Sequence, residues 1–440
     1  MNSSKNATSK ATKSASNLEA NLPPQSTVNV AFDVGSDALD WAMELSGKMI
    51  TGHCENHSPD IRNTLNEIRS QANQSGHDQV RVICESTGIY HRRLLQLAGQ
   101  LEMQTNLVHG EAVAKFRAIQ FADHGKTDRR DPKAALTVAK VGKLIKHRKL
   151  KKEYAQLREL HRLVLRYEAR IKTAKCELHA DLRSLFPDLR LDKSVLYGPT
   201  GRALISAFEA NPYSIFAAGK EKFSTEMKQR SKSTKTSTID KIWNAAVQLA
   251  QNNDDETAVM IAEIQAGAVR QLYAEITGFK EQQGKVERQM QELYKQLQSI
   301  DSHLPSPCKG VVTLRLLSRL VAEIGPPDDF TTINQLMRYA GLNLCERQSG
   351  KWRGRTTISR RGRSELRYVL NLMAIAVVSR ERLFSEYYHS KKDNDKMPGQ
   401  KALTCVMRKL LKMFYGWYKS GRPYDADRVF LMASQSSAAT

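Results

Sequence analysis

Residues 28–55 read VNVAFDVGSDALDWAMELSGKMITGHCE, a stretch in which three β-rich runs follow one another with very little chain between them. Runs of this length, bounded by Gly, Ser and Asp, are typical of β-strands joined by tight turns. The three runs are VNVAFDVG, LDWAMELSG and KMITGHCE. The sequence therefore predicts a three-stranded meander near the start of the chain.

The residues after the meander alternate between helical and extended patterns. A helical pattern covers 59–73, the strand VRVICES covers 80–86, and a second helical pattern covers 90–101. The strand TNLVH (105–109) comes next, followed by helical sequence through Ala139. A meander followed by alternating helix and strand is the order of an RNase H-like α/β layer fold. We therefore expect one such domain over residues 27–148.

Long helical patterns dominate residues 149–303. Two narrow apolar seams with three-four spacing run along this region, as in helices that pack as a coiled coil. The first seam comprises Leu157, Leu160, Val164, Tyr167, Ile171, Ala174 and Leu178. The second comprises Val269, Leu272, Ile276, Phe279, Val286, Met290, Leu293, Leu297 and Ile300. These helices could pair within one chain or between two chains, and we favour a dimer-forming arm because each seam is long and narrow.

Between the two seams, residues 191–237 are rich in Lys and follow no clear period, so we expect an irregular segment. Its KQRSKSTKTS run is interpreted as a mobile loop that contacts phosphate, or as a solvated loop without a partner. A third region, 304–425, is mainly helical, and Gly310 before an apolar helix resembles a helix-hairpin-helix turn. The predicted fold class is α/β plus α, with a disordered tail at 1–26 and a second tail at 426–440.

The composition favours a polyanionic partner. The chain has 68 Lys and Arg against 46 Asp and Glu, a net charge of +22, and basic side chains displace the counterions of nucleic-acid phosphates. A basic protein that merely stays soluble is the alternative. The six cysteines have no CxxC spacing, so reduced thiols in a cytosolic protein are expected. The most apolar run, 369–378, is too short to cross a bilayer, and no membrane span is predicted.

Four acidic residues stand out by their surroundings. Asp33 lies in the apolar run AFDVG and Glu85 ends the apolar run VRVICE, where an unpaired carboxylate is costly to bury. Asp128 and Asp131 are three residues apart in KTDRRDPKAAL, so both can point the same way if a helix begins there. The four could hold one or two Mg²⁺ ions, which prefer such oxygen ligands and assist attack on a phosphodiester.

Each of these acids also has a structural alternative. Asp33 could end a strand, Glu85 could form a salt bridge, and Asp128 or Asp131 could cap a helix, which the following Pro132 favours. The basic neighbours of the acids are expected to bind the DNA backbone. They are Lys126, Arg129, Arg130 and Lys133.

A basic, serine-bearing segment lies at 351–367, with seven basic side chains and one acid. The basic residues are Lys351, Arg353, Arg355, Arg360, Arg361, Arg363 and Arg367, and the first six are expected to contact nucleic acid. Ser349, Ser359 and Ser364 lie in or beside this segment. A serine among guanidinium groups can attack a phosphodiester, because the cations stabilise the developing charge. Each serine could instead cap a helix or contact a phosphate.

These fragments together resemble a known family, the DEDD transposases of the insertion-sequence family one-ten, relatives of the Piv and MooV invertases. The resemblance covers nearly the whole chain after the N-terminal tail. It runs in order through FDVGSD, CESTGIY, KTDRRDPKAA, AEIG, YAGL, QSGKWRGRTTISRRGRSELRYVL and RKLLKMFYGWYKSGRPYD. The chain departs from the family pattern at Pro132-Lys133 and at Cys308-Lys309-Gly310.

The resemblance implies an RNase H/RuvC-like domain, a helical coiled-coil linker (149–303) for assembly, and a C-terminal transposase domain (304–425). By motif, Asp33, Glu85, Asp128 and Asp131 match the four acids that bind Mg²⁺, and Ser349 matches the nucleophilic serine. The partners implied are donor and target DNA, a noncoding bridge RNA, and further copies of the chain in a dimer or tetramer. In such an assembly the acids of one subunit meet the serine of another. A bacterial, cytoplasmic, nucleoid-associated protein is expected.

The function expected from the sequence is an RNA-guided DNA recombinase that cuts and rejoins strands through a phosphoserine at Ser349. One alternative is a hydrolytic RNase H-like transposase or junction nuclease that forms no covalent intermediate. A second alternative is a non-enzymatic nucleic-acid-binding scaffold, against which the expected burial of Asp33 argues.

Overall fold

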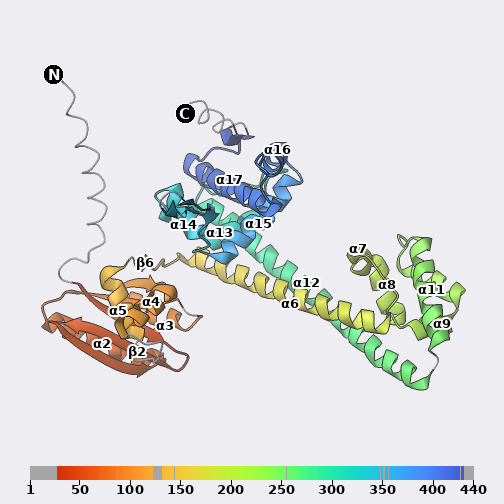
Figure 1. Cartoon of the computed structure of the whole chain (residues 1–440), viewed down its shortest axis with the longest axis horizontal. Helices are drawn as coiled ribbons and strands as arrows, with labels where there is room; N and C mark the ends of the chain where they lie inside the picture. The colour runs from red at the N-terminus through yellow and green to blue at the C-terminus, as the bar shows by residue number, and fades with distance from the viewer. Residues whose placement is uncertain are drawn as a thin grey trace. The chain divides into compact units, whose positions relative to one another are not determined.

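The computed structural model describes residues 27–430, except 87, 122–130, 143, 254, 347, 350, 351, 355 and 427. The chain divides into two compact units, 1–149 and 150–440 (Figure 1). The tail expected at 1–26 and most of the tail expected at 426–440 lie outside the described residues. Among the described helices, none combines the length and the apolar character that crossing a bilayer requires.

A six-stranded sheet forms the centre of unit 1. Its strands are β1 (Thr27–Val34), β2 (Ala38–Leu45), β3 (Lys48–Glu55), β4 (Gln79–Glu85), β5 (Gln104–Val108) and β6 (Ile145–Lys146), in the order β3-β2-β1-β4-β5-β6. The first three form the expected meander, and β4 and β5 continue the sheet parallel to β1. This order is consistent with an RNase H-like fold. The two-residue β6, antiparallel to β5, is too short for a sequence pattern to predict.

Helices cover both faces of this sheet. On one face, α2 (Ser58–Gln74) and α3 (His91–Gln100) share a core with Phe32 and Cys84. On the other face, α4 (Gly110–Phe121) and α5 (Asp131–Val141) share a smaller core with Ala31 and Ile83. Because successive side chains of a strand point to opposite faces, the residues two positions after Ala31 and Ile83 point to the α4–α5 face.

Unit 2 is built on a long helical hairpin of α6 (Lys152–Leu185) and α12 (Glu256–Ile300). The first half of α6 shares a core with the second half of α12, and the remaining halves share another core, so the helices run antiparallel. The two apolar seams of the sequence therefore pack against each other within one chain. Figure 1 shows the two helices side by side. Since all of these seam residues except the exposed Ile300 are buried or half-buried in the hairpin, an oligomer would use mainly other surfaces.

The segment between the hairpin helices is helical, so the irregular segment expected over 191–237 is wrong. It forms α7 (Lys193–Leu196), α8 (Pro199–Phe208), α9 (Pro212–Ala218), α10 (Lys220–Arg230) and α11 (Thr236–Asn252). Sparse apolar residues such as Phe223 and Met227 are fully buried here and hold the short helices together. In the KQRSKSTKTS run, Ser231 and Thr234 are buried, and Thr234 Oγ1 lies 2.8 Å from Ser231 Oγ. The run therefore forms the end of α10, a short turn held by buried hydroxyls, and the start of α11, while Lys232 and Lys235 are exposed and contact of this turn with phosphate stays a prediction.

The other end of the hairpin carries the C-terminal helices. They are α13 (Leu314–Ile324), η2 (Pro327–Asp329), α14 (Ile333–Ala340), α15 (Ser364–Val378), α16 (Arg382–His389), the π-helical η3 (Ser390–Asn394) and α17 (Gly399–Ser420). Four two-residue strands lie between α14 and α15: β7 (Leu344–Cys345), β8 (Gln348–Ser349), β9 (Trp352–Arg353) and β10 (Thr357–Ile358). One core joins these helices to the start of α6 and the end of α12, so this core is continuous across residue 304.

Candidate active site

Two of the predicted acids lie at neighbouring strand ends in unit 1. Phe32 of β1 is in register with Cys84 of β4, so Asp33 and Glu85 follow in step on two adjacent parallel strands. Both side chains point to the face that carries Ala31 and Ile83, beneath α4 and α5. Asp33 is only partly buried, because it lies near the end of its strand, so the deep burial expected from its apolar neighbours is not found.

A further carboxylate that the sequence reasoning missed lies beside them. Asp40 of β2 is directly opposite Asp33 in the antiparallel pair, and His53 of β3 is opposite Asp40. His53 Nδ1 lies 3.2 Å from Asp40 Oδ1. Opposed like charges on one sheet face destabilise each other unless a cation is near. The strand register places Asp40 beside Asp33. In the sequence, the sign of Asp40 is that it is an acid within the second apolar run.

α5 begins with Asp131 and packs on the sheet face that carries Ala31 and Ile83. Lys140, near the end of α5, forms an ion pair with Glu44 of β2, and Glu44 lies beside the beginning of β1 because Met43 is in register with Val30. The nine helical residues from Lys140 back to Asp131 rise about 14 Å, and the four residues of β1 that lead to Asp33 rise about 13 Å. α5 is therefore long enough to span this face from the beginning of β1 to Asp33.

Each of two acids has a specific partner in unit 1. Asp131 is buried, and its Oδ1 lies 2.5 Å from Arg117 Nη1 on α4. The Glu85 carboxylate lies against the first residue of α4, Gly110, so closely that a Cβ atom there would overlap it. The positive end of a helix dipole favours a carboxylate in this position. These contacts fix the two acids separately, at Gly110 and at Arg117, which are seven residues apart along α4.

Among the described residues, the one group of three metal-ligating side chains with ligand atoms within 4.8 Å of one another is Glu55, His57 and Asp60. These side chains are exposed at the end of β3 and the start of α2, and His57 is paired with both acids. They are not the predicted acids. Asp128, Lys126, Arg129 and Arg130 lie outside the described residues, so the fourth acid and its basic neighbours stay a prediction.

The predicted serine lies in unit 2, on a small β-hairpin between α14 and α15. Strand β8 pairs with β9, with Ser349 in register with Trp352, and β7 pairs with β10 nearer the helices. Ser349 is thus the last residue of β8, at the end of the hairpin farther from the helices. Lys351 and Arg355 lie outside the described residues, and for Ser349, Trp352 and Arg353 the backbone position alone is described.

Hydrogen bonds fix the root of this hairpin. Ser359 Oγ donates to Asn343 Oδ1 at 2.6 Å, and Arg360 N donates to the carbonyl of Gly341 at 3.0 Å. Gly341 ends α14 with a φ of +67°, and Gly362 lies directly against its backbone, so a Cβ atom at Gly362 would overlap it. Of the two alternative nucleophiles, Ser359 is therefore engaged inside the fold, and Ser364 Oγ donates to Glu365 at 3.1 Å.

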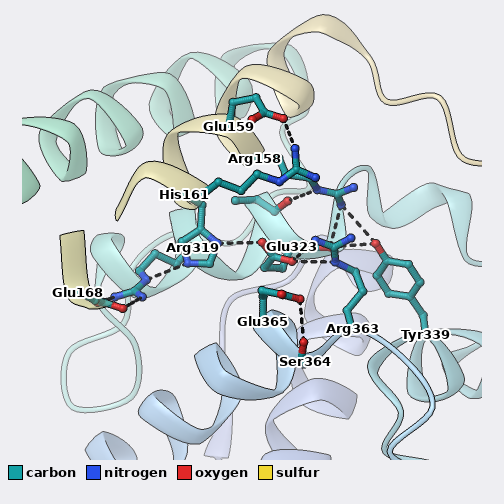
Figure 2. Close-up of polar contacts among 12 residues, drawn as sticks. Arg158, Glu159, His161, Glu168, Arg319, Glu323, Tyr339, Arg363, Ser364 and Glu365 are labelled. Atoms are coloured by element: carbon teal, nitrogen blue, oxygen red, sulfur yellow. Dashed lines mark hydrogen bonds and ion pairs between the residues drawn. The ribbon is translucent and has the colours of Figure 1, made fainter. Parts of the chain in front are cut away.

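A buried polar network holds the same hairpin root on the helices (Figure 2). Glu323, at the end of α13, is fully buried, and its two oxygens bind His161 Nδ1 at 2.9 Å and Arg363 Nε at 2.7 Å. Burial by itself would raise the pKa of Glu323, but the hydrogen bond from His161 and the charges of Arg363 and Arg158 lower it to about 2. Glu323 is therefore an ionised carboxylate that joins α6 to the residue that precedes α15.

Arginines extend this network along α6. Arg319 binds Glu168 through two parallel bonds of 2.8 and 3.0 Å and donates to His161 Nε2 at 3.2 Å. Since Arg can only donate, His161 Nε2 accepts, and the His161 proton lies on Nδ1 facing Glu323. Arg158 donates to the carbonyls of Ala322 and Glu323 at 2.9 and 2.8 Å. Figure 2 shows these side chains converging on the end of α13.

The basic residues of the segment therefore differ in what they can reach. Arg363 is bound to Glu323 and Arg367 donates to the carbonyls of Ala340 and Gly362, so both serve the fold. Arg360 and Arg361 are exposed. The sequence could not distinguish these two pairs, because all four arginines lie in one polar run.

Two transposase family models match the chain. The model of the Transposase IS116/IS110/IS902 family matches residues 310–389, from the turn before α13 through α16 and including the serine-bearing hairpin. A transposase model for the DEDD proteins of the IS110 group matches residues 30–187, which include Asp33, Glu85 and Asp131. No curated protein matches the chain. With more than half of its length covered by these two models in the expected order, the chain belongs to the IS110 family of DEDD transposases.

Proposed function

We propose that this transposase is an RNA-guided DNA recombinase that cuts and rejoins DNA through a phosphoserine at Ser349. The observation that supports the proposal is that Asp33 and Glu85 follow in step on two adjacent strands, on the sheet face covered by α5, the helix that begins with Asp131. A scaffold that only binds nucleic acid gains nothing from carboxylates in that position, since they repel phosphate. The net charge of +22 supports a nucleic-acid substrate for the chain as a whole.

The acids of unit 1 would hold Mg²⁺. Enzymes with this acidic signature usually bind a divalent metal, and carboxylate oxygens are the ligands that Mg²⁺ prefers. The described residues fit such an ion, because Asp33 and Asp40 are cross-strand neighbours that offer carboxylate oxygens. Asp33, Glu85, Asp131 and Asp128 are the proposed ligands. Bound there, the ion would polarise a DNA phosphate and stabilise the leaving oxygen.

The serine performs the covalent step. Ser349 Oγ attacks the phosphorus of a DNA phosphodiester, its proton passes to a carboxylate of the acid site, and a serine–phosphate bond forms. The bond from phosphorus to one sugar oxygen breaks, and that oxygen leaves as a hydroxyl after taking up a proton. Rejoining is the reverse reaction with a sugar hydroxyl of another strand, so no external energy source is needed. Exposed Arg360 and Arg361 would bind the phosphates on either side.

Guidance and assembly complete the proposal. A noncoding bridge RNA pairs with donor and target DNA, and a dimer or tetramer brings the acids of one subunit to the serine of another. The hairpin of α6 and α12 buries its apolar seams within one chain, so the subunits would meet through other surfaces. The protein would act in the bacterial cytoplasm, at the nucleoid.

Replacing the nucleophile tests the covalent step. Ser349→Ala is expected to abolish covalent protein–DNA adducts, detected on denaturing gels after incubation with the element's own end sequences and Mg²⁺. Ser364→Ala is the matched control, because Ser364 is an exposed serine of the same basic segment, and it should form adducts at the normal level. Adducts that persist in Ser349→Ala would overturn the assignment.

The two alternatives give different results in the same assay. Metal-dependent cleavage without any adduct in the unmodified chain would favour a hydrolytic transposase or junction nuclease. Binding without cleavage, unaffected by Asp33→Asn, would favour a scaffold. The RNA part of the proposal is tested by sequencing nucleic acid that copurifies with the chain. One discrete small RNA is expected, and a random population of RNA fragments would contradict guidance.

A further inference from the structure

A cavity of about 870 Å³ lies in unit 2, away from the hairpin that carries Ser349. Residues of α16, η3 and α17 line it, and the segment that follows α17, from Arg422 to Val429, closes it. The chain therefore has a second concave site on the C-terminal helices, formed by elements that take no part in the proposed chemistry.

The cavity is strongly basic. Among its described lining residues, six are cationic and one, Asp425, is acidic. The cations are Lys391, Arg408, Lys409, Lys412, Arg422 and Arg428. Lys391 is paired with Asp395 at 2.6 Å, and Arg428 with Asp425 at 3.7 Å. No described carboxylate forms an ion pair with the other four, so the cavity has an excess of positive charge that a bound anion would offset.

Two buried polar groups of the cavity have no partner within the described chain. They are Nε of Arg408 and the hydroxyl of Tyr424. Buried polar groups in folded proteins nearly always make a hydrogen bond, and these two are exceptions within the described chain. Burial lowers the pKa of Lys409, and the charges of Lys412 and Lys391 lower it further. A bound phosphate would offset the repulsion between these lysine charges.

Aromatic rings and a glycine give the cavity its shape. Trp417 and Tyr424 lie with their ring centroids 6.1 Å apart, and Tyr387 lines the opposite side from α16. Gly416 lies within α17, where glycine weakens a helix, yet a Cβ atom there would meet nothing within 4 Å. Packing within the chain therefore does not require glycine at this position. A glycine would, however, let a flat ligand approach the helix backbone closely.

We propose that this cavity binds one unpaired nucleotide of a nucleic-acid strand. The base stacks beside Trp417 and Tyr424 across Gly416, and the phosphate is bound by Arg408, Lys412 and their neighbours. Stacking on aromatic rings and binding of phosphate by cations are the two contacts by which single strands are held. The inference deepens the proposed function by naming where that nucleic acid is held, but it requires neither Ser349 nor the four acids.

The first test places a larger apolar side chain in the cavity and leaves its charged residues unchanged. Gly416→Leu in the full chain is expected to weaken binding of a fluorescein-labelled single-stranded oligonucleotide by about fivefold or more, measured by fluorescence anisotropy, while its melting temperature is not lowered, because Leu favours a helix more than Gly does. Gly278→Leu is the matched control, because Gly278 also lies within a helix with nothing within 4 Å of a Cβ atom. A second variant, Lys412→Gln, removes one exposed cation of the cavity and should weaken the same binding and its salt dependence.

The oligonucleotide is supplied as RNA and as DNA, and each also as a duplex. A loss confined to single-stranded RNA assigns the nucleotide to an RNA, a loss confined to single-stranded DNA assigns it to a displaced DNA strand, and either supports the cavity. Equal affinity of Gly416→Leu and the unmodified chain for both single strands would overturn it. Ser349→Ala must bind like the unmodified chain, so failure of the phosphoserine assignment and failure of this inference are told apart.

Discussion

Glu85 and Gly110 illustrate how much of this site depends on single residues. Glu85 ends a central strand, and its carboxylate reaches the first residue of α4, where it fits because Gly110 has no side chain. Asp131 is held in the same way by one residue, Arg117, at 2.5 Å. Neither contact buries apolar side chains, so the effect of each contact is to fix the position of one carboxylate.

Adding one methyl group should therefore misplace Glu85. Gly110→Ala is expected to reduce Mg²⁺-dependent DNA cleavage at least about tenfold, because displacement of a catalytic group by about 1 Å can cost a hundredfold. Gly99→Ala, in α3, is the control, since a Cβ atom at Gly99 meets nothing within 4 Å. Cleavage rates and circular dichroism spectra are compared for both variants. Full activity of Gly110→Ala would show that the position of Glu85 does not matter.

The charge of Glu323 should appear in the pH dependence of stability. Its pKa is lowered from the ordinary value of 4.5 to about 2, so its stabilising contribution is complete above about pH 4.5 and is lost as the pH falls towards 2. A shift of this size corresponds to about 3 kcal/mol. Chemical unfolding of unit 2 at several pH values in this window should show that loss in the unmodified chain.

Glu323→Gln keeps the shape of the side chain and should lower the free energy of unfolding at pH 7 by about 3–5 kcal/mol, because it leaves Arg363 buried beside a neutral partner. The same variant should lose little further stability between pH 4.5 and 2. Glu365→Gln, a partly exposed neighbour, serves as the control and should behave like the unmodified chain. An unchanged acid transition in Glu323→Gln would mean that another carboxyl group accounts for it.

At the scale of elements, the sequence predicted the strands and helices whose own residues carry a clear apolar pattern. β1 to β5 begin and end within about two residues of the runs read from the sequence. The buried strands β1, β2 and β4 are nearly continuous apolar runs, whereas the edge strand β3 is largely exposed. The helices of 193–252 were missed, since each buries only a few side chains and the rest of its surface is charged. His161 and Glu323 were missed for a related reason. Each is polar within an apolar helix face, and only the pairing of α6 with α13 reveals its partner.

The α6–α12 hairpin contributes to two hydrophobic cores, one at each end of the hairpin. Both cores contain residues of α6 and α12, but the two sets of buried side chains are separate. Leu178 is fully buried in the core with α8 to α11, and Met290 is fully buried in the core with the C-terminal helices. Leu178→Ala should remove about 2–5 kcal/mol and speed amide hydrogen exchange in α8 to α11 while α15 stays protected. Met290→Ala should give the reverse pattern. Equal acceleration at both ends in either variant would mean that unit 2 opens as one cooperative body.

At the scale of the whole molecule, charge and chemistry are divided between the two units. The acids lie in the unit of residues 1–149, and the serine, the exposed arginines and the basic cavity lie in the unit of residues 150–440. The net charge of +22 exceeds what solubility needs. A net charge of this size is expected of a protein that neutralises many phosphates at once. The affinity of the chain for nucleic acid should therefore depend on salt concentration far more than on temperature or on single apolar contacts.

The affinity for duplex DNA should therefore fall linearly in a plot of log affinity against log salt concentration. Neutralising about six to ten phosphates implies a loss of about 10³–10⁵ in affinity between about 50 and 200 mM salt. Arg360→Ala and Arg361→Ala, both exposed in the described structure, should each reduce the slope by about one. Arg382→Ala should leave it unchanged, because Arg382 is already paired with Glu386 at 3.2 Å. If all three variants reduced the slope equally, the charge would act as a diffuse field and the serine-bearing segment would have no special contact with the DNA backbone.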